Sequence, residues 1–294
     1  MTEKKDPLFN KIALVGIGLI GSSLALATRK NGLAKEIVAC ARSQGTRDTA
    51  MRLGLVDSIY ETPAEAVVDA DLVILCTPVS TYDDLACAMA PSLKEGAIVT
   101  DVGSVKESVI RDVGPHLPDG VHFVPGHPIA GTEHSGPNAA ISGLFIGKTN
   151  IVCEVEKTTF KLQEKALKLF TDIGMRIRYM NPEAHDKHIA YVSHLSHISS
   201  FMLGKTVIEK EKNERDIFDM AGSGFASTVR LAMSSPEMWT PIFKQNKTNV
   251  IETLEEYINN LTHFKELMKD DDFEAIFKEM KNTNHIKDIL KGIS

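Results

Sequence analysis

His127 has a setting that marks it as a candidate for chemistry. It lies in the segment GHPIAGTEHSG, residues 126–136, between a glycine and a proline. A residue that precedes proline is held in an extended conformation, so His127 does not fit the interior of a helix. Because an imidazole gains and loses a proton near neutral pH, we expect His127 to act as an acid or base.

The glycine-rich segment GIGLIG, residues 16–21, predicts a bound dinucleotide. It follows a strand predicted over residues 11–16 and opens a helix predicted over residues 19–30. Its glycines permit a tight turn, close approach of the backbone to a pyrophosphate and close packing of helix on strand, and the helix N-terminus offers free N–H groups to phosphates. A glycine turn without a ligand is the alternative reading.

The end of the second predicted strand, residues 36–41, should indicate which dinucleotide binds. An acidic residue there would bind the ribose 2′-hydroxyl of NAD. This chain has Ala41, Arg42 and Ser43 instead. Arg42 suits either the 2′-phosphate of NADP or a surface position over the adenine, so the sequence leaves the choice between NAD and NADP open.

Residues 1–180 are predicted to form an α/β domain. Further strands are predicted over residues 71–76, 97–101 and 121–124, and strand-like patterns recur over residues 150–155 and 175–180. Helices are predicted over residues 46–53 and 158–171. Strands that alternate with helices indicate a parallel sheet covered on both faces. We therefore expect a Rossmann-type dinucleotide-binding domain.

Residues 181–294 are predicted to form an all-α domain for substrate binding and dimerisation. Its first helix should begin at Asn181-Pro182-Glu183, with asparagine as the N-cap and proline in the first turn. Six apolar residues further on are spaced 4, 3, 4, 3 and 4 apart, like a coiled-coil seam: Val250, Leu254, Tyr257, Leu261, Phe264 and Met268. This seam fits either packing within one subunit or contact between the two subunits of a homodimer.

The composition is that of a soluble globular protein. Of 294 residues, 43% are hydrophobic and 24% charged, and the net charge of −6 argues against nucleic-acid binding. No apolar run is long enough to span a bilayer, and the N-terminal segment MTEKKDPLFN lacks the apolar core of a signal peptide. The four cysteines lack CxxC spacing and are expected to be buried free thiols. We therefore expect a cytoplasmic protein without a membrane partner.

Three further segments carry polar groups that suit a substrate site. DVGSVK, residues 101–106, follows a predicted strand at the edge where ligands of open α/β sheets bind, so Ser104 is expected near a nicotinamide, at a helix N-cap, or both. The segments HDKHIAYVSHLSH, residues 185–197, and AGSGFASTVR, residues 221–230, belong to the helical domain. Together with GIGLIG, GHPIAGTE and the tryptophan nine residues after Arg230, they resemble the prephenate/arogenate dehydrogenase family of tyrosine biosynthesis over nearly the whole chain.

This resemblance implies an NAD(P)-dependent oxidative decarboxylation. Prephenate carries a ring hydroxyl at C4 and a ring carboxylate at C1. Hydride leaves C4 for the nicotinamide, the hydroxyl proton passes to a base, CO2 departs and the ring aromatises to 4-hydroxyphenylpyruvate. Arogenate, with an amino group in place of the side-chain keto group, is the alternative substrate and would give tyrosine directly. The resemblance also implies a small-molecule site between the domains. We expect no fused chorismate mutase or ACT domain of the kind that some members carry, because the two predicted domains leave no residues for one.

The resemblance assigns roles to individual residues. His127 matches the histidine that accepts the hydroxyl proton, so activity is expected to rise as a group with a pKa near that of histidine loses its proton. Ser104 matches a serine that orients hydroxyl and nicotinamide, and Arg230 matches an arginine that binds a substrate carboxylate. The other expected substrate-site residues are His197, Thr132, Glu133, His185 and His194, the last two fitting support as well as contact. The expected cofactor-binding residues are Gly16, Gly18, Leu19, Ile20, Gly21, Arg42, Ser43, Thr77, Pro78 and Ser104.

Other readings of these residues exist. The histidines of residues 185–197 suggest a metal site, but His185 and His194 should face opposite sides of a straight helix, so no metal is expected. Arg230 also fits a structural ion pair. The rival functions are another two-domain dehydrogenase, such as a β-hydroxyacid or 6-phosphogluconate type, and a protein that senses NAD(P) without turnover.

Overall fold

The computed structural model describes residues 6–214 and 216–291. The chain divides into two compact units, Met1–Lys247 and Thr248–Ser294. The first five residues, which belong to the segment where no signal peptide is expected, lie outside the described residues.

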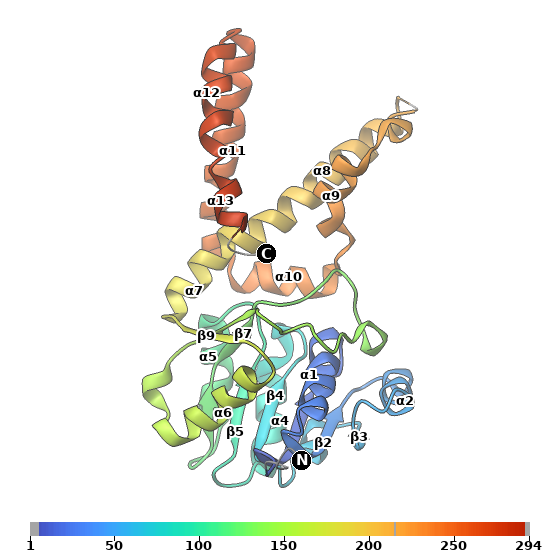
Figure 1. Ribbon diagram of the computed structural model, residues 1–294, viewed down its shortest axis with the longest axis vertical. Coiled ribbons are helices and arrows are strands. Elements are labelled where there is room, and N and C mark those ends of the chain that lie inside the picture. Colours follow the sequence, from blue (N-terminus) through green and yellow to red (C-terminus); the bar gives the residue numbers. More distant parts are fainter. Residues whose placement is uncertain (1–5, 215, 292–294) are drawn as a thin grey trace, which may run out of the picture. The chain divides into compact units, whose positions relative to one another are not determined.

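A six-stranded sheet forms the centre of the first unit (Figure 1). Its strands stand in the order β3 (Ser58–Tyr60), β2 (Ala34–Cys40), β1 (Phe9–Val15), β4 (Leu72–Leu75), β5 (Ile98–Asp101) and β6 (His122–Val124). Each neighbouring pair is parallel. This order is that of the doubly wound dinucleotide-binding fold, in which the chain reverses direction across the sheet between β1 and β4. The Rossmann-type prediction is confirmed.

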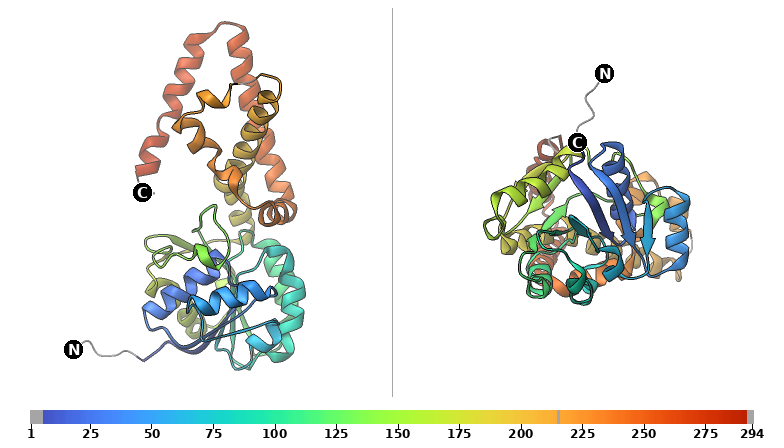
Figure 2. Two further views of the ribbon diagram at one scale, coloured as in Figure 1. Left: turned by 90° about the vertical axis from the view of Figure 1, so that its right-hand side faces the viewer. Right: turned by 90° about the horizontal axis from the view of Figure 1, so that it is seen from below.

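Helices cover both faces of this sheet (Figures 1 and 2). Successive side chains of β1 alternate between the faces, so Leu14 packs in one apolar cluster and Val15 in the other. The first cluster includes residues of α1 (Leu19–Lys30), α2 (Gln44–Arg52) and α6 (Phe160–Asp172). The second includes residues of α3 (Pro63–Ala66), α4 (Tyr82–Met89) and α5 (Glu107–Val113). Burial on both sides explains why the strands are apolar without alternation.

A second, three-stranded sheet carries His127. In it, β7 (Gly126–Pro128) pairs antiparallel with β8 (Thr149–Val152), which pairs parallel with β9 (Arg176–Tyr179). The strand patterns near residues 150 and 175 are therefore confirmed, although these strands are outside the large sheet. The strands β3 and β7 were not predicted, because neither of these segments, SIY and GHP, contains an apolar run.

Beyond residue 181 the described part of the chain contains helices and turns but no strand. The side chain of Asn181 accepts hydrogen bonds from the backbone N–H groups of Glu183 and Ala184, so the predicted start of α7 (Pro182–Ile189) is confirmed. A π-helical turn, Ala190–His194, leads into α8 (Leu195–Glu211). The helices α9 (Ser223–Val229) and α10 (Pro236–Gln245) follow. Because α7–α10 belong to the first compact unit, the domain boundary at residue 180 stays a prediction.

The second unit contains three helices: α11 (Lys247–Lys269), α12 (Phe273–Thr283) and α13 (Ile286–Lys291). The first residue of α11, Lys247, is the last residue of the first unit. Along the predicted seam of α11, Val250 is buried, whereas Leu261, Phe264 and Met268 are 54%, 38% and 48% exposed. Packing within the subunit therefore does not account for the C-terminal half of the seam.

The four cysteines are free. Cys40 and Cys153 are buried as expected, and burial raises the pKa of the Cys40 thiol to about 11. Cys76 is half-buried and Cys87 is exposed, so the expectation of burial is wrong for Cys87, whose helix α4 has a solvent face. Among the helices of the described residues, none has the length and apolar character needed to cross a membrane.

Candidate active site

The glycine turn after β1 accepts no larger side chain at two positions. Gly16 has φ +106°, and a Cβ there would lie 2.8 Å from the side chain of Thr77 and 2.9 Å from the backbone of Cys76. A Cβ on Gly21 would lie 2.3 Å from the carbonyl oxygen of Gly16. Glycine at both positions lets the start of α1 pack against the end of β4.

The N-terminus of α1 faces a large cavity. No side chain caps this helix, and Gly18, Leu19 and Ile20 line a cavity of about 840 Å³. Free N–H groups and the positive end of the helix dipole suit a pyrophosphate. Thr77 and Pro78, which follow β4, line the same cavity. The residues present therefore fit a dinucleotide, with Gly16 and Gly21 shaping the turn without lining the cavity.

Arg42 and Ser43 lie apart from this cavity wall, at the carboxyl end of β2. Both are exposed, and Ser43 is the N-cap residue of α2. The neighbouring Arg47 donates hydrogen bonds to the carbonyl oxygens of Ala41 and Arg42. Within the described residues, the Arg42 guanidinium forms no ion pair.

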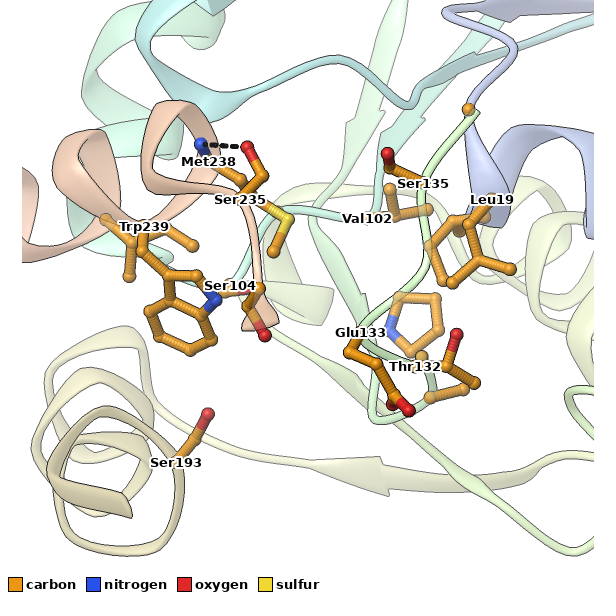
Figure 3. A pocket seen from close by; sticks show the side chains of 18 of the residues that line it. Leu19, Val102, Ser104, Thr132, Glu133, Ser135, Ser193, Ser235, Met238 and Trp239 are labelled. Carbon is orange, nitrogen blue, oxygen red and sulfur yellow. Dashed lines mark hydrogen bonds between the residues drawn. The ribbon is translucent and has the colours of Figure 1, made fainter. Parts of the chain in front are cut away.

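Six of the residues expected at the substrate site line this one cavity: Ser104, His127, Thr132, Glu133, His197 and Arg230. Figure 3 shows Trp239 and Ser193 on one side of the cavity and Thr132 and Glu133 on the other. His197 stacks on Trp239, with ring centroids 3.5 Å apart and an interplanar angle of 29°. The structure therefore joins the glycine turn, the GSVK and GHPIAGTE segments and the helical segments in one site.

His127 is buried in β7, and its Nδ1 lies 2.8 Å from Nε2 of His185. Nδ1 of His185 lies 2.7 Å from Oδ1 of Asp186. Burial, followed by the charges of His185, Lys106 and His194, holds the pKa of His127 well below its ordinary value of 6.5. His127 is therefore neutral at neutral pH and able to accept a proton.

His185 and His194 are not part of the cavity wall, so of the two roles left open for them, support and contact, the geometry favours support. His185 lies behind His127, and His194 faces Asn246, which also donates a hydrogen bond to the carbonyl oxygen of Asp186. Burial lowers the pKa of His194 to about 4. The prediction that His185 and His194 face opposite sides assumed a straight α-helix, and the π-helical turn at Ala190–His194 removes that premise.

Ser104 is half-buried in the cavity wall. The alternative reading of Ser104 as the N-cap of the following helix is wrong, because the N-cap residue of α5 is Lys106. No hydrogen bond joins the Ser104 hydroxyl to the part of the chain that the structure describes. Its hydroxyl is therefore available to a ligand.

Arg230 lies in the cavity wall and pairs with Glu133 across 2.8 Å. The Arg230 side chain is 50% exposed, so this pair is reached by solvent. The pKa of Glu133 is lowered by its own backbone N–H and by Arg230. The ion-pair reading of Arg230 thus holds, and the guanidinium lies in the cavity wall.

The cavity wall also includes polar side chains that were not expected to contact ligands, among them Lys148, Ser193 and Trp239. The indole N–H of Trp239 is buried and has no hydrogen-bond partner in the described chain. The sequence identified Trp239 and Ser193 only as parts of motifs, Ser193 within residues 185–197, and Lys148 stands in a segment without any distinctive pattern. In the described ranges, no three His, Cys, Asp or Glu side chains converge to form a metal site.

Comparison with known proteins agrees with this architecture. The family models "Prephenate dehydrogenase, nucleotide-binding domain" and "Prephenate dehydrogenase, dimerization domain" match residues 24–179 and 181–282. Cyclohexadienyl dehydrogenase of Zymomonas mobilis is 34% identical over 97% of both chains. Prephenate dehydrogenase of Bacillus subtilis is 31% identical over 99% of this chain and 77% of that protein.

A solved structure is similar as well. The crystal structure of prephenate dehydrogenase from A. aeolicus in complex with hydroxyphenyl propionate and NAD+ has a TM-score of 0.86 and 34% sequence identity, and the match covers 94% of this chain and 96% of that chain. Both domain models, both relatives and this structure point the same way, and the chain belongs to the prephenate dehydrogenase family.

Proposed function

We propose that this chain is a prephenate dehydrogenase of L-tyrosine biosynthesis, which converts prephenate to 4-hydroxyphenylpyruvate and CO2. The observation that carries the proposal is the position of neutral, buried His127 in the same cavity wall as the nucleotide turn, Ser104 and Arg230. The similarity to relatives named prephenate dehydrogenase and cyclohexadienyl dehydrogenase supports it. Turnover is thus favoured over the sensing of NAD(P) alone.

His127 performs the proton transfer of this reaction. A bound nicotinamide dinucleotide supplies the acceptor for the hydride that leaves C4. As C4 becomes a carbonyl carbon, His127 takes the hydroxyl proton. The C1–CO2 bond then breaks, its electron pair enters the ring, and the C4 oxygen becomes a phenolate that recovers the proton from His127. No net proton is gained or lost, and aromatisation supplies the driving force.

Other residues of the cavity wall orient the substrate. Ser104 is placed to hydrogen-bond the C4 hydroxyl, and Arg230 binds a carboxylate, for which a planar, permanently charged guanidinium is suited. His197, stacked on Trp239, forms the wall beside Arg230, and the free indole N–H of Trp239 offers a donor to a ligand oxygen. Thr132 and Glu133 shape the loop on the opposite side (Figure 3). Together these contacts hold the bound substrate in the orientation that the reaction requires.

For the cofactor we propose NAD+, with NADP+ as a second ligand. The end of β2 carries Arg42 and Ser43 where strict selection of NAD calls for a carboxylate. An exposed guanidinium without an ion-pair partner in the described chain suits a 2′-phosphate. We expect the site to discriminate weakly between the two dinucleotides.

Arogenate is the second candidate substrate. It differs from prephenate by an ammonium group in place of the side-chain keto group. The carboxylate of Glu133 stands in the cavity wall beside Arg230, where it is a partner for that ammonium. This observation favours use of both substrates, as the name of the Zymomonas mobilis relative also suggests.

We further propose that residues 1–180 form the dinucleotide-binding domain and residues 181–294 the substrate and dimerisation domain of a homodimer. The two family models divide the chain near this boundary, and the second is named for dimerization. Exposed apolar side chains on α11 support contact with a second subunit.

We also propose a cytoplasmic location. The four cysteines are free, as is usual for proteins of a reducing compartment.

Initial rates with each substrate crossed with each cofactor test the proposal. Purified protein, prephenate and NAD+ should produce NADH, followed by absorbance, together with CO2 and 4-hydroxyphenylpyruvate. The rates with arogenate and with NADP+ show whether the substrate site and the cofactor site each accept a second ligand. Tight binding of NAD(P) without turnover of either substrate would exclude the dehydrogenase and favour the sensing protein.

A further inference from the structure

We propose that His185 and Asp186 are positioning residues that keep a proton on Nδ1 of His127 and so leave Nε2 of His127 as the proton acceptor. The inference uses one part of the proposed function, namely that His127 accepts the proton of the substrate. Neither His185 nor Asp186 lines the cavity, so their effect on the substrate passes through His127.

The contact chain runs inward from the cavity wall. Nδ1 of His127 lies 2.8 Å from Nε2 of His185, and Nδ1 of His185 lies 2.7 Å from Oδ1 of Asp186. His185 and Asp186 are each only 2% exposed. Buried from solvent, these three side chains have fixed partners, and water does not compete for their hydrogen bonds.

The direction of each hydrogen bond follows from Asp186. Its Oδ1 accepts the backbone N–H of Lys106 at 2.7 Å, and its Oδ2 accepts that of Glu107 at 3.0 Å. The carboxylate therefore acts as an acceptor throughout, and Nδ1 of His185 donates to it. Neutral imidazole has one donor and one acceptor nitrogen, so Nε2 of His185 accepts. Nδ1 of His127 must then be the donor.

This tautomer suits proton acceptance in the cavity. The Nδ1 edge of His127 faces His185, which is not part of the wall, so Nε2 is the nitrogen left for the cavity that His127 lines. A neutral ring with its proton on Nδ1 carries a lone pair on Nε2. The opposite tautomer would present an N–H to the C4 hydroxyl and be unable to take its proton.

The same arrangement stabilises the imidazolium that forms during turnover. The charged groups that face this cluster are Lys106 and Asp101 from the segment around β5, Asp186 from α7, and the neighbouring imidazoles of His185 and His194. Burial disfavours positive charge on His127, and the charges of His185, Lys106 and His194 add to this effect. Polarisation of His185 by the Asp186 carboxylate offsets part of this cost at the moment of proton transfer.

Asp186 also joins two segments that carry the site. It accepts the backbone N–H groups of Lys106 and Glu107 at the start of α5, shortly after Ser104, while its neighbour His185 contacts His127. One pair of adjacent residues on α7 thus fixes the base and the loop that bears Ser104. A purely structural cap would need Asp186 but not His185, which distinguishes the two roles.

The first experiment reads the tautomer directly in the intact protein. Long-range ¹H–¹⁵N spectra of protein labelled with ¹⁵N-histidine, assigned by comparison with His127→Asn, should show the His127 proton on Nδ1 at neutral pH. A proton on Nε2 would overturn the inference. Because this readout needs no turnover, it remains valid even if the wild-type protein fails every substrate assay and the proposed function falls.

The second experiment compares His185→Leu with His185→Gln. Leucine removes the acceptor for Nδ1–H, whereas the glutamine amide oxygen can replace it. We expect kcat to fall roughly 10²- to 10³-fold in His185→Leu and roughly 10-fold or less in His185→Gln, because loss of the correct tautomer disables a base while its binding contacts persist. KM for prephenate should change little in either variant.

His188 provides the matched control, since it lies on the same helix α7 but is exposed and outside the cavity wall. His188→Leu should keep wild-type kcat. Equal losses in His185→Leu and His185→Gln, or wild-type turnover in His185→Leu, would overturn the positioning role. If His185→Leu does not fold, two results decide the question. The wild-type spectrum should show the proton on Nδ1, and the glutamine variant should keep that signal and lose no more than roughly 10-fold in kcat.

Discussion

The ammonium of Lys106 donates a hydrogen bond to the carbonyl oxygen of Gly126 at 2.6 Å, so the GSVK segment holds the peptide that precedes His127. Lys106 is fully buried and forms an ion pair with Asp101, the last residue of β5. Asp101 in turn accepts the backbone N–H of Gly126 at 3.0 Å. One buried ion pair therefore satisfies both backbone groups of Gly126, and its cation stands close enough to His127 to disfavour protonation.

The pH dependence of kcat/KM should reflect this environment. His127 must be neutral to accept a proton, and its pKa is held well below 6.5 by burial and by the charges of His185, Lys106 and His194. A base with a lowered pKa stays active as the pH falls through 6.5, so kcat/KM should begin to decline only below that value. This corrects the expectation from the sequence of an inflection near the ordinary pKa of histidine.

The measurement is an initial-rate profile at subsaturating prephenate, which reports groups of the free enzyme. Saturating substrate places carboxylates near His127 and should shift the kcat inflection to higher pH than the kcat/KM inflection. A kcat/KM inflection at or above 6.5 would contradict the environment described for His127.

His127→Asn should lower kcat by roughly 10²- to 10⁴-fold, the range for loss of a positioned base. Asparagine is similar in size and keeps a polar side chain, so KM for prephenate and the affinity for NAD+ should change little. His122→Asn, on β6 of the large sheet and outside the cavity wall, is the control and should retain wild-type kcat. Normal turnover by His127→Asn would remove His127 from the reaction.

The sequence predicted what local patterns determine. The helix α1 was predicted with both its observed ends, because a glycine turn opens it and Asn31-Gly32 ends it, and α7 begins at the predicted Asn181 cap. Apolar runs revealed most strands of the large sheet. These features depend on neighbouring residues, which a sequence shows directly.

Contacts between distant segments were beyond such patterns. His127 and His185 are 58 positions apart and meet only because β7 and the first turns of α7 come together. The π-helical turn at Ala190–His194 has no recognisable sequence signal, and it stands between His185, which lies behind the cavity wall, and His197, which is part of it. The motifs thus point to residues that the fold gathers at one cavity, whereas only the fold separates the residues of the cavity wall from those behind it.

Arg230→Ala should weaken prephenate binding while leaving kcat less affected. Because the guanidinium is half-exposed and already paired with Glu133, the loss should be about 1–2 kcal/mol, or a roughly 5- to 30-fold rise in KM, which is less than a fully desolvated pair would lose. Arg111→Ala is the control, since Arg111 is exposed, pairs with Asp112 and lies outside the cavity wall. An unchanged KM in Arg230→Ala would exclude a carboxylate contact.

Arg42→Ala should change the choice of cofactor. If Arg42 binds a 2′-phosphate, its removal should raise KM for NADP+ roughly 10-fold, as expected for one exposed charge-assisted contact, and leave KM for NAD+ within about twofold. Arg52→Ala, an exposed arginine at the end of α2, controls for the loss of surface charge. Equal effects on the two dinucleotides would place Arg42 over the adenine instead.

The exposed half of the α11 seam should hold the homodimer together. Leu261, Phe264 and Met268 follow one another at the spacing of a coiled-coil seam and are exposed in the single chain. A carboxylate buried in that contact would be unpaired, so Phe264→Asp should weaken association by roughly 2–4 kcal/mol and give monomers at micromolar concentration. Asn259→Asp, an exposed position on the same helix, adds the same charge outside the seam and should remain dimeric. Light scattering measures both masses, and a monomeric wild-type protein or a dimeric Phe264→Asp variant would show that subunits do not meet through this face of α11.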